Sequence, residues 1–186
     1  ITTGMRSSSG TMSRDGKMLY ISVSDDVASE RPYYFTTGMV MNLETGKVDT
    51  LFQRQGFIGG AQFSPDGKKL LFTGTPEAFG GIGNVCPEGM IPNNYEHELF
   101  LMDLDTKKIE PITKELDPSI SSVHWSLADN HLYAVCENKD LVSVFRMDMT
   151  EKKGHRNGKW EMLQLNEPNI KGGISLAEEK PGMVYT

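Results

Sequence analysis

A five-residue turn, Ser64-Pro65-Asp66-Gly67-Lys68 (residues 64–68), decides the fold, because the chain repeats it. Related turns are Ser13-Arg14-Asp15-Gly16-Lys17, Ser126-Leu127-Ala128-Asp129-Asn130 and a degenerate copy from Ser175-Leu176-Ala177-Glu178. An apolar run follows each copy, at residues 18–21, 70–73, 132–135 and 183–185. Since an Asp-Gly pair favours the positive φ of a tight hairpin, each copy is predicted to join two antiparallel strands.

A second repeated turn follows the first. Met41-Asn42-Leu43-Glu44-Thr45-Gly46-Lys47 matches Met102-Asp103-Leu104-Asp105-Thr106-Lys107-Lys108, and Met147-Asp148-Met149 matches more loosely. These turns are predicted to join residues 37–43 to 48–52, 99–104 to 109–112, and 142–149 to 160–165. Four strands at a period near fifty residues indicate a propeller blade, with strands a, b, c and d in chain order.

The fold class predicted is therefore all-β, a β-propeller fragment of about three and a half four-stranded antiparallel blades. The predicted blades are residues 9–53, 58–113 and 120–165, with the start of a further blade at 170–186. A blade without its outer strands leaves an open edge, which natural sheets rarely tolerate. We therefore expect a fragment of a longer chain, with self-association through open blade edges as an expected behaviour of the isolated piece.

The chain carries its extra length between strands b and c. The distance from the first turn to the second is 28 residues in blade one, 38 in blade two and 21 in blade three. The blade-two insertion covers about residues 75–94 and is rich in Gly, Pro and Asn, so a loop without helix is predicted. Long irregular loops within a compact repeat are more often functional than decorative.

Composition excludes several classes of protein. The 186 residues carry a net charge of -6, which argues against a general nucleic-acid binder. No apolar run approaches the roughly 20 residues of a membrane-spanning helix. The two cysteines, Cys86 and Cys136, form neither a zinc site nor a disulfide framework; free thiols and a single bridge both remain open.

Catalytic and cofactor motifs are missing from the sequence. There is no Gly-x-Ser-x-Gly nucleophile elbow, no His-Glu-x-x-His pair, and no phosphate or calcium loop. Gly81-Ile82-Gly83-Asn84-Val85-Cys86 lacks the third glycine and the following helix of a dinucleotide site. Asp103, Asp105 and Asp148 are interpreted as hairpin-turn residues rather than metal ligands. We expect no catalytic residue, no metal and no cofactor in this chain.

The charges divide between the two ends of the predicted blades. The b–c and d–a connections hold twelve acidic residues against five basic ones, whereas the a–b and c–d turns are richer in lysine and arginine. Turn chemistry of the Asp-Gly-Lys type is one explanation. The other is an acidic face that attracts a cationic group, such as the amino terminus of a peptide.

The segment Gln62-Phe63-Ser64-Pro65-Asp66-Gly67-Lys68-Lys69-Leu70-Leu71-Phe72-Thr73 resembles the repeats of TolB-like, WD40-like and peptidase propellers. Gly74-Thr75-Pro76-Glu77-Ala78-Phe79-Gly80-Gly81-Ile82-Gly83, Ile91-Pro92-Asn93 and Glu98-Leu99-Phe100-Leu101-Met102-Asp103-Leu104 are more specific. They resemble the propeller of prolyl-oligopeptidase-family serine peptidases, which include dipeptidyl and acylaminoacyl peptidases, with bacterial members the most similar.

This resemblance implies a non-catalytic propeller that restricts access to short peptides for a C-terminal α/β-hydrolase domain carrying a Ser-Asp-His triad. It also implies a periplasmic or secreted setting. Acidic residues of some members hold the substrate's amino terminus, and the candidates here are Glu77, Glu88, Glu96 and Glu98, with Tyr95 as a packing or hydrogen-bonding partner. The family's paired-glutamate motif has no match, which puts dipeptidyl activity in doubt. The alternatives are a non-enzymatic propeller that binds protein or glycan, and a TolB-like assembly scaffold.

Overall fold

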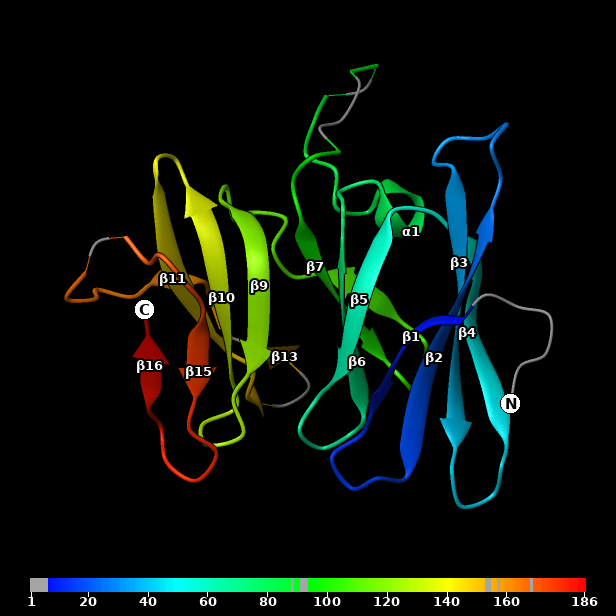
Figure 1. The fold of residues 1–186 in the computed structure, drawn as a ribbon, viewed down its shortest axis with the longest axis horizontal. Coiled ribbons are helices and arrows are strands. Elements are labelled where there is room, and N and C mark those ends of the chain that lie inside the picture. The colour runs from blue at the N-terminus through cyan, green and yellow to red at the C-terminus, as the bar shows by residue number, and fades with distance from the viewer. Residues whose placement is uncertain (1–6, 88, 91–93, 153–154, 157, 168) are drawn as a thin grey trace. The chain divides into compact units, whose positions relative to one another are not determined.

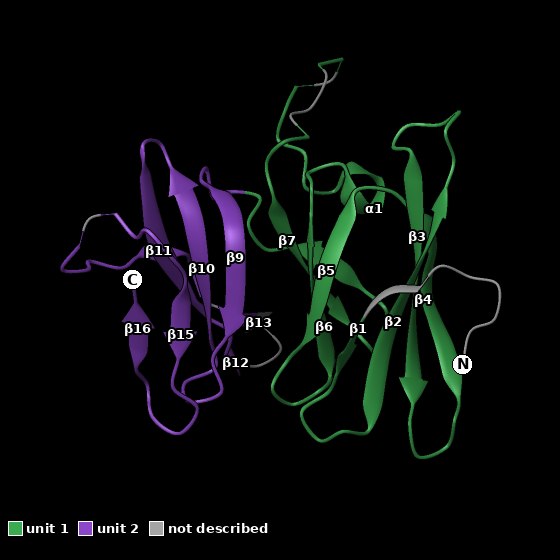
Figure 2. Ribbon diagram, in the orientation of Figure 1, with its two compact units in different colours: residues 1–114 green, residues 115–186 purple. Residues whose placement is uncertain are grey.

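A computed structural model describes residues 7–87, 89–90, 94–152, 155–156, 158–167 and 169–186 (Figure 1). The chain divides into two compact units, residues 1–114 and 115–186, which are described separately (Figure 2). Nearly all of the regular structure is antiparallel β-sheet. Among the described residues, no helix is long and apolar enough to cross a membrane.

Unit 1 contains two four-stranded antiparallel sheets, and in each sheet the strand order follows the chain. The first consists of β1 (Ser7–Met12), β2 (Met18–Asp26), β3 (Tyr34–Asn42) and β4 (Val48–Gln55). The second consists of β5 (Ile58–Phe63), β6 (Lys69–Gly74), β7 (Glu98–Asp103) and β8 (Ile109–Pro111). Four strands that meander in sequence order are the arrangement of a propeller blade.

The repeated Ser-x-Asp-Gly-Lys turn has the same hydrogen bonds in both sheets of unit 1. The Ser64 hydroxyl donates to Asp66 Oδ1 at 2.7 Å and accepts from the Lys69 backbone N–H at 2.9 Å. The Ser13 hydroxyl donates to Asp15 at the same distance of 2.7 Å. Gly16 and Gly67 both have a φ of 71°, which favours glycine. The repeat is therefore a turn whose side chains and backbone satisfy one another.

The second repeated turn lies at the same end of each sheet as the first. The Leu43 N–H donates to Lys17 C=O at 2.7 Å, and the Leu104 N–H donates to Lys68 C=O at 3.0 Å. Asp103 Oδ1 accepts from the Thr106 N–H at 2.8 Å, which confirms the turn role of this aspartate. The a–b and c–d turns thus share one end of each sheet, and the b–c connections emerge at the other.

Aromatic rings fill the core between the two sheets of unit 1. The Phe72 ring on β6 contacts the rings of Tyr20 and Phe52 edge-to-face, with centroids 5.6 Å apart in both pairs. Tyr20, Phe72 and Phe100 are fully buried. An ion pair also links the sheets, because Lys107 Nζ lies 2.9 Å from Asp49 Oδ1 on β4. The two sheets therefore share one hydrophobic core.

Unit 2 contains a third four-stranded sheet, built from β9 (Ser119–Trp125), β10 (His131–Asn138), β11 (Leu141–Asp148) and β14 (Glu161–Met162). Two hairpins complete it: β12 (Glu151–Lys152) with β13 (His155–Arg156), and β15 (Ile174–Leu176) with β16 (Met183–Tyr185). Its core joins Tyr133, Val135 and Val144 to Ile170 and Ile174. In the third copy of the turn, Asp129 stands at the glycine position, and the positive φ, of 54°, lies at the next residue, Asn130.

The structure corrects two expectations at the level of single elements. The blade-two insertion is not entirely loop, because residues Ala78–Gly81 form a four-residue helix, α1, in which Phe79 and Gly80 leave helical geometry. The outer strand of the third sheet is also shorter than residues 160–165, since only Glu161–Met162 pair with β11. Cys86 and Cys136 are both free thiols.

Candidate functional site

The blade-two insertion leaves the sheet at Gly74, the last residue of β6, and returns at Glu98, the first residue of β7. These two residues are paired across the strands. Above this pair, the Thr75 hydroxyl lies 3.3 Å from Asn94 Oδ1 and ties the two legs of the insertion together. The insertion is therefore a closed loop standing on the end of the second sheet (Figure 1).

Phe79 fixes the base of this loop to the core of unit 1. Its ring contacts Phe52, Phe72 and Phe100 edge-to-face, with centroid distances of 5.4, 5.6 and 5.4 Å. Its φ of 55° costs energy for a residue with a side chain, and the buried aromatic contacts offset that cost. The first half of the insertion is therefore part of the core rather than a free loop.

A close approach of backbone to backbone explains one glycine of this segment. A Cβ atom on Gly83 would lie 3.1 Å from the backbone of Pro76 and 3.2 Å from the Phe100 ring. Only glycine allows the chain to fold back this closely over the core. Gly83 is thus explained by tight packing at the base of the insertion.

Glu77, the first candidate residue, precedes α1. Its Oε1 accepts a hydrogen bond from Asn84 Nδ2 at 2.6 Å, and its backbone C=O accepts from the Gly81 N–H at 3.1 Å. Glu77 is half-buried. The carboxylate of Glu77 thus holds Asn84, and its backbone C=O closes the turn of α1.

Glu98, at the start of β7, is 8% exposed. The Thr113 hydroxyl donates a hydrogen bond to Glu98 Oε2, while the same Thr113 oxygen accepts from the Leu99 N–H at 2.8 Å. Burial raises the pKa of the Glu98 carboxyl; the nearby Glu96 charge raises it further, and the Thr113 bond and Lys114 oppose the rise. The carboxylate is thus committed to an internal contact and is costly to ionise.

The remaining candidates lie towards the end of the insertion. Glu96 is partly exposed and interacts electrostatically with Glu98, so the structure brings these two acids together. Tyr95 is 94% exposed. Glu88 lies outside the described residues. Glu96 therefore lies beside the buried Glu98 at the end of the insertion, and its side chain is partly exposed.

Three supporting residues were not anticipated from the sequence. Asn84 binds Glu77, Thr113 binds Glu98, and Lys114 Nζ donates to Ile82 C=O at 3.1 Å, which fastens the insertion to the chain after β8. Thr113 and Lys114 are separated from the insertion in sequence, so no local pattern could reveal them. Within the described residues, no group of three His, Cys, Asp or Glu side chains is placed to hold a metal ion.

Solved structures match this chain in fold, whereas the sequence comparisons find no match. No family model matches it, and no curated protein matches it either. TolB from Acinetobacter baumannii is 18% identical with a TM-score of 0.56, over 91% of this chain and 35% of that protein. The β-propeller domain of the Trilobed protease from Pyrococcus furiosus is 15% identical with a TM-score of 0.55, over 88% and 44%.

An acylaminoacyl peptidase from Pyrococcus horikoshii is 15% identical with a TM-score of 0.58, over 99% of this chain and 28% of that protein. The chain therefore spans between about a quarter and a half of the length of these structures. At these identities the likeness concerns fold, and it agrees with the TolB-like and peptidase resemblance in the sequence. The chain has the fold of a β-propeller, built from four-stranded antiparallel blades of the kind found in TolB and in peptidase propellers.

Proposed function

We propose that this chain is the non-catalytic propeller part of a serine peptidase of the prolyl-oligopeptidase type. In this role it admits and positions short peptides for a C-terminal α/β-hydrolase domain of the same parent protein. The observation that carries the proposal is the blade-two insertion. Its sequence is the most family-specific part of the chain, and Phe79 and Lys114 hold its base against the sheet. A loop anchored in this way can present side chains in a defined position.

Glu96 is the residue proposed to receive the amino terminus of the peptide. An ammonium group requires a carboxylate partner at hydrogen-bond distance. Glu96 lies beside Glu98 at the end of the insertion, where the chain re-enters the sheet. The Glu96 side chain is partly exposed at this position, so the amino terminus of a peptide can reach its carboxylate.

The test uses the full-length protein and pairs of substrates that differ only in acetylation of the amino terminus. Glu96→Gln is expected to lower kcat/KM by roughly 10-fold on the free form and to leave the acetylated form unchanged, since a charged hydrogen bond contributes about 1.5–3 kcal/mol. Asp105→Asn, an exposed turn residue at the opposite end of the same sheet, is the control of equal charge change. Equal effects of Glu96→Gln on both substrates would reject the amine-binding role.

The alternative is a non-enzymatic, TolB-like propeller that binds protein or glycan partners, which the similarity in fold to TolB favours. Labelling of the full-length protein with a fluorophosphonate probe separates the two, because only a triad-bearing hydrolase domain reacts. One labelled serine outside residues 1–186 supports the peptidase; absence of labelling supports the alternative. Under either proposal we place the protein in the periplasm or outside the cell, and fractionation of the native host checks this.

A further inference from the structure

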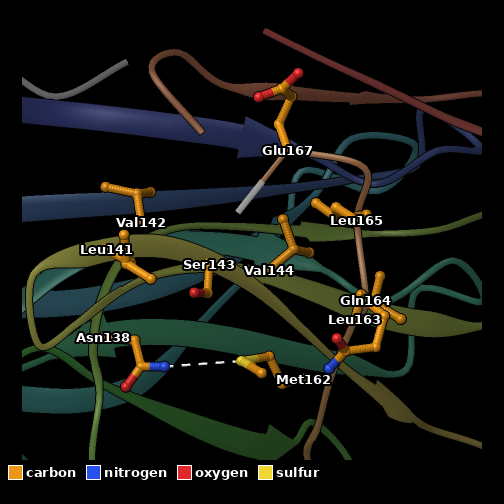
Figure 3. A pocket seen from close by; sticks show the side chains of 10 residues that line it. All are labelled: Asn138, Leu141, Val142, Ser143, Val144, Met162, Leu163, Gln164, Leu165 and Glu167. Carbon is orange, nitrogen blue, oxygen red and sulfur yellow. Dashed lines mark hydrogen bonds between the residues drawn. The ribbon is translucent and has the colours of Figure 1, made fainter. Parts of the chain in front are cut away.

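A second candidate site lies in unit 2, where the outer strand of the third sheet opens. A cavity of about 210 Å³ is lined by residues of the β10–β11 hairpin and of the segment 162–167. This is enough space for several water molecules or for one small ligand. Six of its ten lining side chains are aliphatic or methionine, and the other four are Asn138, Ser143, Gln164 and Glu167 (Figure 3).

Backbone hydrogen bonds define both sides of the opening beside β11. On one side of it, the Leu163 N–H donates to Val144 C=O at 2.8 Å. On the other side, the Val142 N–H donates to Asn169 Oδ1 at 2.8 Å, and Val142 C=O accepts from the Ile170 N–H at 3.0 Å. Because these backbone groups already have partners, an added peptide strand is not the expected occupant. A ligand must be recognised by side chains.

The four polar side chains around the cavity are available for such recognition. Within the described residues, Ser143, Gln164 and Glu167 form no side-chain hydrogen bond, although Ser143 is only 8% exposed. The Asn138 amide has one weak partner, Met162 Sδ at 3.7 Å. An oxygen acceptor would bind this amide more strongly than the thioether does.

The one charged side chain and the two amide side chains lie in different parts of the lining. In Figure 3 the Glu167 carboxylate lies above the other labelled side chains, and the amides of Asn138 and Gln164 lie below, with aliphatic side chains between them. Glu167 is the single charged residue of the lining, so its end favours a cation. The amides and the Ser143 hydroxyl can donate to an oxygen acceptor.

We propose that this cavity binds a small aliphatic molecule with an ammonium group at one end and a carboxylate at the other. The ammonium contacts Glu167, the carboxylate accepts hydrogen bonds from Asn138 and Gln164, and the methylene chain lies against the aliphatic lining. The proposal concerns unit 2 alone and is independent of the role assigned to the blade-two insertion.

Calorimetric titration of the 186-residue chain tests the proposal, with 5-aminopentanoate as the probe and pentanoate and pentylamine as analogues lacking one charged end. Saturable binding of the probe is expected, with each analogue at least about 10-fold weaker. Glu167→Gln should reduce probe binding to the level of pentanoate. Glu179→Gln, an exposed acid in the same unit, is the matched control and should bind like the unaltered chain.

Amide chemical-shift changes locate the binding and should concentrate at residues 138–144 and 162–167. The proposal is overturned if no saturation occurs up to about 10 mM probe, a concentration that would reveal even millimolar affinity. It is also overturned if pentanoate binds as well as the probe, if Glu167→Gln binds like Glu179→Gln, or if the shift changes fall in unit 1.

Discussion

Thr113, two residues beyond β8, donates a hydrogen bond to the buried carboxylate of Glu98 at the start of β7 and so closes the foot of the blade-two insertion. The same threonine oxygen accepts the Leu99 N–H at 2.8 Å. One hydroxyl therefore satisfies a buried acid and a buried backbone donor. We expect the insertion to depend on this contact because the insertion ends at Glu98, the first residue of β7.

The first prediction concerns the pH dependence of stability. Burial raises the pKa of the Glu98 carboxyl above its value in the unfolded chain, so the folded state binds a proton more readily. The free energy of unfolding therefore falls as pH rises through the interval between the unfolded-state and folded-state pKa values. Above the folded-state pKa it falls no further on account of Glu98. Glu98→Gln cannot ionise. Its free energy of unfolding, relative to the unaltered chain, should increase from pH 4 to pH 7, measured by urea denaturation at each pH.

Thr113→Val is the companion variant. It keeps the shape of the side chain but leaves Glu98 and the Leu99 N–H without their shared partner, which should cost about 1–3 kcal/mol of unfolding free energy. A pH-independent difference between Glu98→Gln and the unaltered chain, together with a neutral Thr113→Val, would show that this contact does not determine the stability of the insertion.

The second prediction concerns Phe79. Removing its ring with Phe79→Ala deletes three aromatic contacts in the core and should destabilise the chain by about 2–4 kcal/mol, below the value for a fully buried Phe because this side chain is half-buried. Phe79→Gly also removes the ring but relieves the positive φ of 55°. Chemical denaturation should therefore rank Phe79→Gly no less stable than Phe79→Ala. The reverse order would mean that the backbone geometry at this position is not retained.

The third prediction concerns the buried hydroxyl of Tyr20. Burial raises the pKa of this group, and no described residue is a hydrogen-bond partner of its oxygen. Burying an unsatisfied polar atom costs about 1–3 kcal/mol, so Tyr20→Phe should raise the free energy of unfolding by about 1 kcal/mol while keeping the ring contact with Phe72. A loss of stability in the thermal or urea transition would reveal a partner for the hydroxyl. Tyr133→Phe is the control, because Tyr133 donates to Asp129 at 2.8 Å and should lose stability.

The fourth prediction concerns the two thiols. Cys136 is fully buried on β10, and burial raises its pKa to about 12, so it holds almost no reactive thiolate at neutral pH. Cys86 lies partly exposed on the blade-two insertion. A disulfide reagent should therefore titrate one thiol in the folded chain and two in denaturant, and Cys86→Ser should abolish the fast reaction. Two fast thiols in the folded chain would contradict the burial of β10.

Much of the fold was determined by local sequence. The turn repeat works because Ser64 and Asp66, two residues apart, hydrogen-bond to each other and to the adjacent backbone, so the pattern acts wherever it occurs. The strand pairs, the shared end of the a–b and c–d turns, and the position of the long insertion all followed from these turns and their spacing. The propeller class was confirmed for the same reason.

Only the tertiary structure decided what the insertion does within the fold. In the sequence Phe79 is one aromatic residue in a glycine-rich segment, and its place among Phe52, Phe72 and Phe100 depends on three different strands. Glu77, Glu96 and Glu98 looked equivalent as acids, but burial and the partners Asn84 and Thr113 distinguish them. The sequence shows which side chains can carry a charge. Their solvation and their partners depend on residues that come close to them only when the chain folds.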